Sequence, residues 1–190
     1  LAGTVGESGS ASVLLATAKD GTIWFTLQMP AGVAVVRPGS VPALVNSVEG
    51  GTIGVLVARD GMVWYAVQAA GDQPGRLERL SQVSYPPQYP QQIPLPRRSD
   101  GSWGQPYLVA EAPDGTVWAT DTLAAVFHKV RPNGQAEAHT ALDYKLPADC
   151  HTYGPKFVGI APARDGNMWA VGCKTIARIT PAGQITLFAF

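Results

Sequence analysis

The chain has 190 residues, of which only 15% are charged, and its 14 basic and 14 acidic residues balance to a formal net charge of zero. This length predicts a single domain, residues 1–190, and the neutral, scattered charge argues against nucleic acid as a partner. No apolar run approaches the roughly 20 residues that a membrane helix needs, so we expect no membrane insertion.

A seven-residue phrase occurs four times along the chain: Ala, any residue, Asp, Gly, any residue, an aliphatic residue and Trp. The copies lie at residues 18–24, 58–64, 112–118 and 163–169, at intervals of 40, 54 and 51 residues. A fixed phrase at such intervals indicates a repeat architecture. In each copy an apolar run precedes and follows the Asp-Gly pair, which predicts a β-hairpin with a type I′ turn.

Each repeat is predicted to contain four short strands, A to D, joined in sequence. In the last repeat these are the apolar runs 157–161, 168–171, 175–179 and 184–188, with a Thr-Pro-Ala-Gly turn before the fourth. In the second repeat a proline-rich stretch, residues 85–96, replaces this turn and ends in a predicted edge strand. The sequence therefore predicts an all-β fold, a β-propeller of four four-stranded antiparallel blades at about residues 10–46, 50–96, 104–142 and 155–190.

The repeated residues are expected to build the blades. The four Trp side chains fall at one position of strand B, where they would fill the space between adjacent sheets, and the four Asp residues would form turns. Four blades of this length could close into a ring. They could equally be part of a larger ring, completed by further blades or by a second copy of the chain in a homodimer.

The Asp-Gly-x-x-Trp phrase resembles the repeat of virginiamycin B lyase, as does the run Ile176-Ala177-Arg178-Ile179-Thr180-Pro181-Ala182-Gly183-Gln184-Ile185-Thr186. The related NHL and SMP-30-like propellers share this style of repeat. The resemblance covers all four repeats and implies a propeller fold. It also implies an activity, the opening of an antibiotic's ester-linked ring by elimination. That reaction would use a His where strand A enters, an acidic residue just after the strand-B Trp, and a magnesium ion.

Most of the positions that would carry this chemistry hold other residues here, and Asp121 is the single match. Eleven residues before the repeated Trp stand Val13, Ile53, Tyr107 and Val158. Three residues after it stand Leu27, Val67, Asp121 and Gly172. None of the first four is a base at neutral pH, and a single carboxylate is too few for the oxygen coordination of Mg²⁺. We therefore assign no catalytic residue and no metal ligand from the sequence.

A binding site is expected on the face that carries the longer D-to-A and B-to-C connections, because such loops usually gather function. Aromatic and polar side chains collect there in the third and fourth repeats, a composition common in ligand pockets and at protein interfaces. Ordinary loop chemistry is the open alternative. His128, inside a strand, is expected to be a hydrogen-bonded structural residue. The predicted ligand-binding residues are Arg98, Trp103, Tyr107, Asp121, His151 and Tyr153.

The two cysteines are predicted to form a disulfide. Cys150 precedes strand A of the fourth repeat and Cys173 follows its strand B, so both lie at the same end of one hairpin. A disulfide favours a secreted or extracytoplasmic protein. The sequence thus favours a non-catalytic extracytoplasmic module that binds a protein or a small molecule without a cofactor. The alternative is a divergent lyase or lactonase with Mg²⁺ or Ca²⁺.

Overall fold

The computed structural model describes residues 14–81, 89–141, 144–145, 150 and 156–190, and within them the regular structure is all β. Sixteen strands form four four-stranded antiparallel sheets. The first two sheets contain β1 (Leu15–Thr17), β2 (Ile23–Gln28), β3 (Ala31–Val36), β4 (Ala43–Ser47), β5 (Thr52–Val57), β6 (Met62–Val67), β7 (Arg76–Ser81) and β8 (Gln91–Pro94). The other two contain β9 (Pro106–Glu111), β10 (Val117–Asp121), β11 (Val126–Val130), β12 (Ala136–Thr140), β13 (Phe157–Pro162), β14 (Met168–Gly172), β15 (Thr175–Ile179) and β16 (Ile185–Ala189).

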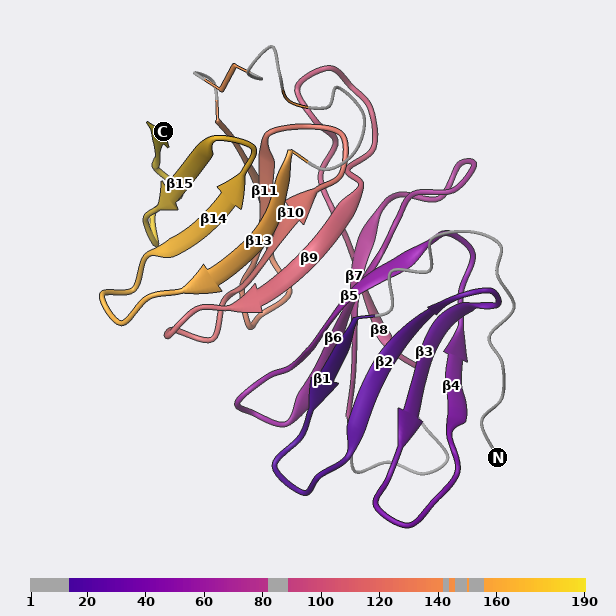
Figure 1. The fold of residues 1–190 in the computed structure, drawn as a ribbon. Coiled ribbons are helices and arrows are strands. Elements are labelled where there is room, and N and C mark those ends of the chain that lie inside the picture. The colour runs from indigo at the N-terminus through magenta and orange to yellow at the C-terminus, as the bar shows by residue number, and fades with distance from the viewer. Residues whose placement is uncertain (1–13, 82–88, 142–143, 146–149, 151–155) are drawn as a thin grey trace.

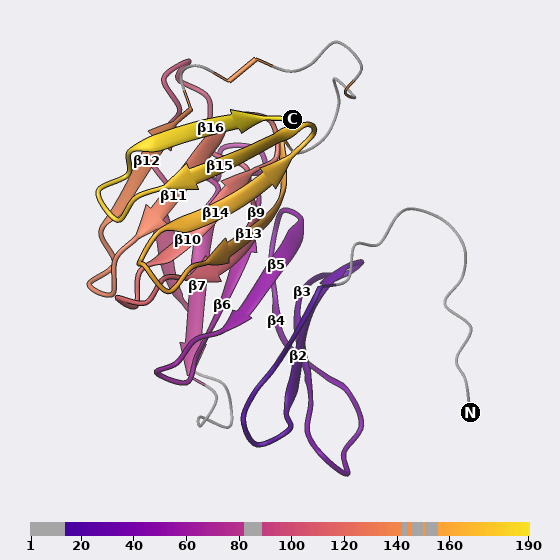
Figure 2. The same cartoon turned by 60° about the vertical axis from the view of Figure 1, so that its left-hand side comes forward.

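Each sheet is a propeller blade whose strands pair in chain order. Consecutive blades pack through their innermost strands, β1 on β5, β5 on β9 and β9 on β13, so the sheets fan out from a common side (Figures 1 and 2). Among the described residues no extensive packing joins the first sheet to the fourth. The predicted all-β propeller with four blades is confirmed, and its blades form an open arc.

The four Asp-Gly turns share one geometry, which differs from the predicted type I′ turn. In the first, the Gly21 N–H donates to the Ala18 carbonyl at 3.1 Å, and Gly21 has a φ of +83°. Asp20 keeps a negative φ, because Lys174 is the sole non-glycine residue with positive φ in the described chain. This is a type I turn followed by a left-handed glycine, the three-residue hairpin loop. The prediction of type I′ was wrong because one further residue, the one before the Asp, belongs to the loop.

The Asp side chains act as the sequence suggested. In every copy the carboxylate accepts a hydrogen bond from the backbone N–H two residues later, at 2.9–3.0 Å, and so caps its own turn. In the first, third and fourth blades a Cβ added to the turn glycine would lie 3.3–3.5 Å from the proline of the C-to-D turn. The short turns of a blade therefore lie together on one face.

The repeated Trp side chains form the core between blades. Trp24, Trp64 and Trp118 are at most 2% exposed, and each packs among apolar residues of the next sheet. Trp169, in the fourth blade, is only half-buried. The prediction of packing between blades is thus confirmed for the first three.

The predicted disulfide is present. Cys150 and Cys173 are bonded with their Cα atoms 6.0 Å apart, and the bond ties the segment before β13 to the turn after β14. In the second blade β8 is an edge strand, as its prolines suggested. The rest of the proline-rich stretch, up to residue 88, lies outside the described residues.

Candidate functional site

Asp121 is the centre of a buried polar network at the end of β10. Arg98 donates two hydrogen bonds to its carboxylate, from Nη2 to Oδ1 at 2.8 Å and from Nε to Oδ2 at 3.2 Å. His128 on β11 places Nε2 3.0 Å from Oδ2. The side chains of Asp121 and His128 are fully buried and that of Arg98 is 7% exposed. A bidentate Arg–carboxylate pair held this far from water orders the loop that carries Arg98.

Backbone N–H groups take up the remaining capacity of the Asp121 carboxylate. The amides of Gln105, Leu123 and Ala124 donate to it at 2.8, 2.9 and 3.2 Å. Burial alone would raise the pKa of Asp121, but the hydrogen bonds from His128 and the Gln105 amide outweigh it, so the pKa lies below its usual value. Asp121 is therefore an ionised, fully bonded structural anion.

The hydrogen bonds that occupy the Asp121 carboxylate determine whether it could also bind a magnesium or calcium ion. Such ions need several oxygen ligands with open lone pairs. The lone pairs of Asp121 are already shared among two side chains and three amides, and the described residues contain no group of three or more His, Cys, Asp or Glu side chains able to hold a metal. The residues present do not fit the divalent ion that the resemblance implies.

The other predicted site residues that the structure describes, Trp103 and Tyr107, lie near this network without joining it. Trp103 is half-buried, and the Arg97 guanidinium stacks on its ring, 3.6 Å from the centroid. Tyr107 is half-buried on β9, next to the pairing of Pro106 with Asp121. His151 and Tyr153 lie outside the described residues. Arg98 and Asp121 are thus in direct contact, and neither Trp103 nor Tyr107, the other two described members of the predicted set, hydrogen-bonds with them.

A second buried polar network lies between the first and second blades, and the sequence reading missed it. Its centre is Glu78 on β7, whose side chain is completely buried. Oε2 accepts from the Tyr65 hydroxyl at 2.6 Å and from Asn46 Nδ2 at 3.1 Å. Oε1 accepts from Arg76 Nε at 2.6 Å and from Gln92 Nε2 at 3.2 Å. Four donors from four strands therefore converge on one carboxylate.

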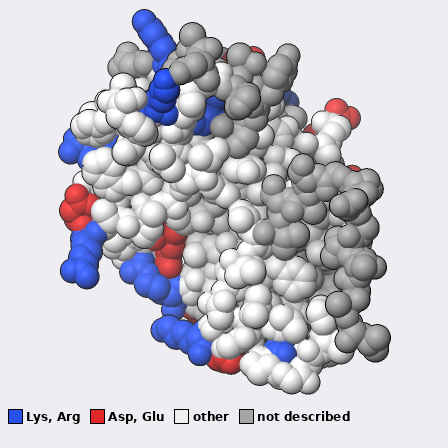
Figure 3. Space-filling view, viewed as in Figure 1, with Lys and Arg blue, Asp and Glu red and all other residues white. Residues whose placement is uncertain are grey.

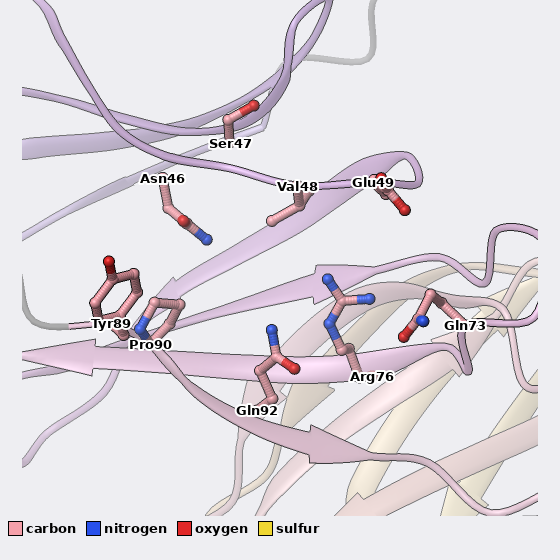
Figure 4. A pocket seen from close by; sticks show the side chains of 9 residues that line it. All are labelled: Asn46, Ser47, Val48, Glu49, Gln73, Arg76, Tyr89, Pro90 and Gln92. Carbon is pink, nitrogen blue, oxygen red and sulfur yellow. The ribbon is translucent and has the colours of Figure 1, made fainter.

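This network forms the floor of a pocket of about 290 Å³ (Figure 4). The wall above it is the connection from β4 to β5, and Gln73 from the connection between β6 and β7 closes one end. These are a D-to-A and a B-to-C connection, so the pocket reaches the face on which the sequence predicted a site. Tyr89, fully exposed, stands at the other end. The lining residues are Asn46, Ser47, Val48, Glu49, Gln73, Arg76, Tyr89, Pro90 and Gln92.

Arg76 gives the pocket its distinctive chemistry. Its side chain is 9% exposed, and Nε is bound to Glu78. The two terminal nitrogens point into the pocket, towards the segment of Val48 and Glu49 (Figure 4). Within the described part of the chain neither nitrogen donates a hydrogen bond to another residue. A guanidinium that is positioned by a buried carboxylate, with its outer donors unused, is arranged for an incoming acceptor.

Both networks contain a polar residue at the same position of the repeat, and this position could have indicated them from the sequence. Opposite the residue that follows the repeated Trp, strand C carries Ala34 in the first blade, Glu78 in the second, His128 in the third and Ala177 in the fourth. A small apolar residue fits between sheets without partners. A carboxylate or imidazole there must be hydrogen-bonded, so these two blades had to assemble a polar network.

The four four-stranded sheets and the repeated Asp-Gly-x-x-Trp phrase define the class of protein as a β-propeller. The chain is 32% identical over 168 residues to a virginiamycin B lyase of Nocardia farcinica, a match that covers 87% of this chain and 50% of the relative. The chain therefore spans about half the length of this curated relative. No protein-family model matches it.

Solved structures agree on the fold. A catalytically inactive virginiamycin B lyase from Staphylococcus aureus with quinupristin superposes with a TM-score of 0.72 at 20% identity, over 96% of this chain and 57% of that one. A gluconolactonase from Xanthomonas campestris superposes with a TM-score of 0.59 at 14% identity, over 89% of this chain and 57% of that one. An extracellular domain from Bacteroides thetaiotaomicron superposes with a TM-score of 0.60 at 11% identity, over 95% of this chain and 22% of that one. The chain is therefore a β-propeller that is similar in sequence and in fold to virginiamycin B lyases.

Proposed function

We propose that this part of the propeller is a non-catalytic binding module and that its pocket at Arg76 takes a small neutral ligand rich in hydroxyl groups. The observation that carries the proposal is that both terminal nitrogens of Arg76 point into a polar pocket, and that neither donates a hydrogen bond within the described residues. The Asp121 carboxylate offers no comparable free group, since its lone pairs are bonded within the protein.

The ligand class follows from the balance of donors, acceptors and charge. Arg76 and Glu78 form a neutral ion pair, and the exposed carboxylate of Glu49 adds negative charge to the rim. A fixed anion is therefore disfavoured. The amide oxygens of Asn46 and Gln92 have no donor within the described residues, so the pocket offers acceptors beside the Arg76 donors. Hydroxyl groups satisfy both, because each donates once and accepts twice.

Tyr89 supplies an apolar surface at the end of the pocket. Its side chain is fully exposed, and its ring stands beside Pro90 (Figure 4). An exposed aromatic ring next to a few fixed polar groups is the usual composition of a small-molecule site. A monosaccharide, with one apolar ring face and an equatorial belt of hydroxyl groups, matches this arrangement.

Saturation-transfer NMR against neutral monosaccharides up to about 20 mM should detect binding with a dissociation constant of around 1 mM. Arg76→Lys keeps the charge beside Glu78 and removes the guanidinium fork, and we expect it to weaken binding about tenfold. Tyr89→Ala should do the same by removing the ring. Arg79→Lys is the matched control, because Arg79 lies on the same strand but contacts Gln91 and Pro132. It should leave the affinity unchanged.

Two results would contradict this assignment. One is the absence of binding by any neutral sugar in the panel. The other is binding that Arg76→Lys and Arg79→Lys alter equally, since the pocket would then have no special part in it. Thermal unfolding of each variant separates loss of binding from loss of fold, and the exposed Tyr89→Ala change tests the pocket without touching the buried pair.

A second candidate, a divergent lyase or lactonase with Mg²⁺ or Ca²⁺, is favoured by the similarity to virginiamycin B lyase and gluconolactonase. The aligned strand-A positions in the described residues, Ile53, Tyr107 and Val158, provide no base. Incubation with quinupristin and Mg²⁺, followed by chromatography, distinguishes the two candidates. Our proposal expects intact quinupristin, and a linear product would establish the enzyme.

The extracytoplasmic location remains part of the proposal. The disulfide and the likeness to an extracellular domain support it. In the residues described here no helix has the length and apolar character needed to cross a membrane.

A further inference from the structure

The connection from β6 to β7, residues 68–75, belongs to the pocket at Arg76 and is held by the third blade. Gln73 lines the pocket, and its backbone pairs with that of Ala70 through two N–H to carbonyl hydrogen bonds of 3.0 and 3.3 Å. The connection projects at the upper right of Figures 1 and 3, where the surface carries few charged side chains. Among the described residues no salt bridge involves it. Its position therefore depends on hydrogen bonds between uncharged groups.

Gln105, directly before β9 in the third blade, makes the contacts that fix the start of this connection. Its side-chain Oε1 accepts a hydrogen bond from the backbone N–H of Ala69 at 3.1 Å. Its carbonyl accepts from the backbone N–H and the hydroxyl of Thr122, at 2.8 and 3.1 Å. Thr122 Oγ1 in turn accepts from Gln68 Nε2 at 3.0 Å. Since the N–H of Gln105 donates to Asp121, its backbone is fixed on both sides before its side chain reaches the second blade.

The same connection also contacts the wall of the pocket. The Gln68 N–H donates to the Gly51 carbonyl at 2.8 Å. Gly50 has a φ of +99°, and a Cβ added to it would lie 2.3 Å from the Gln68 carbonyl oxygen, so the two backbones touch. Gly50 directly follows Glu49, which lies with Gln73 at one end of the pocket (Figure 4). A shift of the connection would therefore move both the end and the wall of the pocket.

We propose that Gln105 is a positioning residue for the pocket at Arg76 and acts through the connection of residues 68–73. This inference rests on the binding function proposed above. Gln105 does not line the pocket itself. Because it fixes the connection before a ligand arrives, it reduces the conformational freedom that binding would otherwise remove, and such preorganisation raises affinity.

Two substitutions at Gln105 test this role. Gln105→Ala removes the acceptor of the Ala69 N–H, and we expect it to weaken binding of the tightest-binding neutral monosaccharide about fivefold. Gln105→Glu keeps an oxygen at this position. Because Nε2 of Gln105 donates no hydrogen bond among the described residues, Gln105→Glu should restore most of the affinity. Gln105 is half-buried, and thermal unfolding confirms that each variant is folded.

A control and a double variant show whether the effect passes through the connection. Gln135→Ala is the same change in the same blade, but the Gln135 side chain accepts from Arg131 on the exposed turn after β11, so the affinity should stay unchanged. Gln73→Ala removes the side chain at the end of the pocket. Combined with Gln105→Ala it should weaken binding by less than the product of the two single effects, because both act on one element.

Amide hydrogen exchange without sugar tests the positioning separately from the binding. In Gln105→Ala the N–H groups of Ala69 and Gln73 should exchange about tenfold faster, and Gln105→Glu should return them to the wild-type rates. If the wild type binds no sugar, the proposed function fails, whereas faster exchange at Gln73 would still support Gln105 as the residue that fixes this end of the pocket. Unchanged exchange at Gln73, or faster exchange with the sugar affinity kept, would overturn the inference.

Discussion

Replacing Asp121 by alanine should lower the free energy of unfolding by about 3–5 kcal/mol, the range for breaking a buried ion pair by removing one partner. Without the carboxylate the Arg98 guanidinium keeps its charge in a site where it is 7% exposed. His128 loses the partner of Nε2, and its Nδ1 already has none among the described residues. Three backbone amides lose their acceptor as well.

Urea denaturation of wild type and Asp121→Ala measures this loss. Asp72→Ala is the control, since Asp72 is an exposed carboxylate on a connecting loop of the second blade and should change stability by less than about 0.5 kcal/mol. Equal effects of the two substitutions would show that the Asp121 network does not stabilise the fold. Loss of sugar binding in Asp121→Ala without loss of stability would contradict our assignment of the ligand to Arg76.

The contribution of Asp121 should also depend on pH in a defined direction. The pKa of Asp121 in the folded protein lies below the ordinary 3.8, because hydrogen bonds to the carboxylate outweigh the effect of burial. The folded state therefore binds this proton less readily than the unfolded state does. The stabilisation is complete above pH 3.8 and is lost as the pH falls through the folded value. The difference between wild type and Asp121→Asn should shrink over that acidic range.

How far the sequence predicts this structure can be followed through particular residues. The repeated phrase predicted the hairpins and the Trp positions because turn chemistry and strand alternation are local. It missed the turn type because the Asp-Gly pair alone does not define how many residues the loop contains. The disulfide was predictable because Cys150 and Cys173 flank one hairpin.

The pocket was not predictable in the same way. Glu78 is bound by Asn46, 32 residues earlier, and by Gln92, 14 residues later, and the approach of β4 to β7 depends on how two blades pack. The sequence could have flagged Glu78 and His128 as polar residues at a strand-C position where the other blades have alanine. It could not tell which donors would converge on them. The sequence singled out Asp121 because it is the one acidic residue three positions after a repeated Trp. Its role as a structural anion is revealed only by its partners.

The second large effect concerns the repeated Trp, whose contribution to stability can be compared at two positions of the same motif, Trp118 and Trp169. Trp118→Ala should cost about 3–5 kcal/mol of stability, because the ring is 1% exposed in the core between the third and fourth blades. Trp169→Ala makes the same change at the equivalent position of the fourth blade, where the ring is half-buried. Trp169→Ala should lower the free energy of unfolding by less than half as much as Trp118→Ala, since its ring returns less apolar surface to water on unfolding.

Urea denaturation of the wild type and of both variants under one set of conditions measures the two losses. Trp118→Ala should show the larger one, because its ring lies in the core between two sheets of the described chain. Equal costs for the two substitutions would contradict this expectation and would mean that the Trp169 ring contributes as much to stability as the Trp118 ring does.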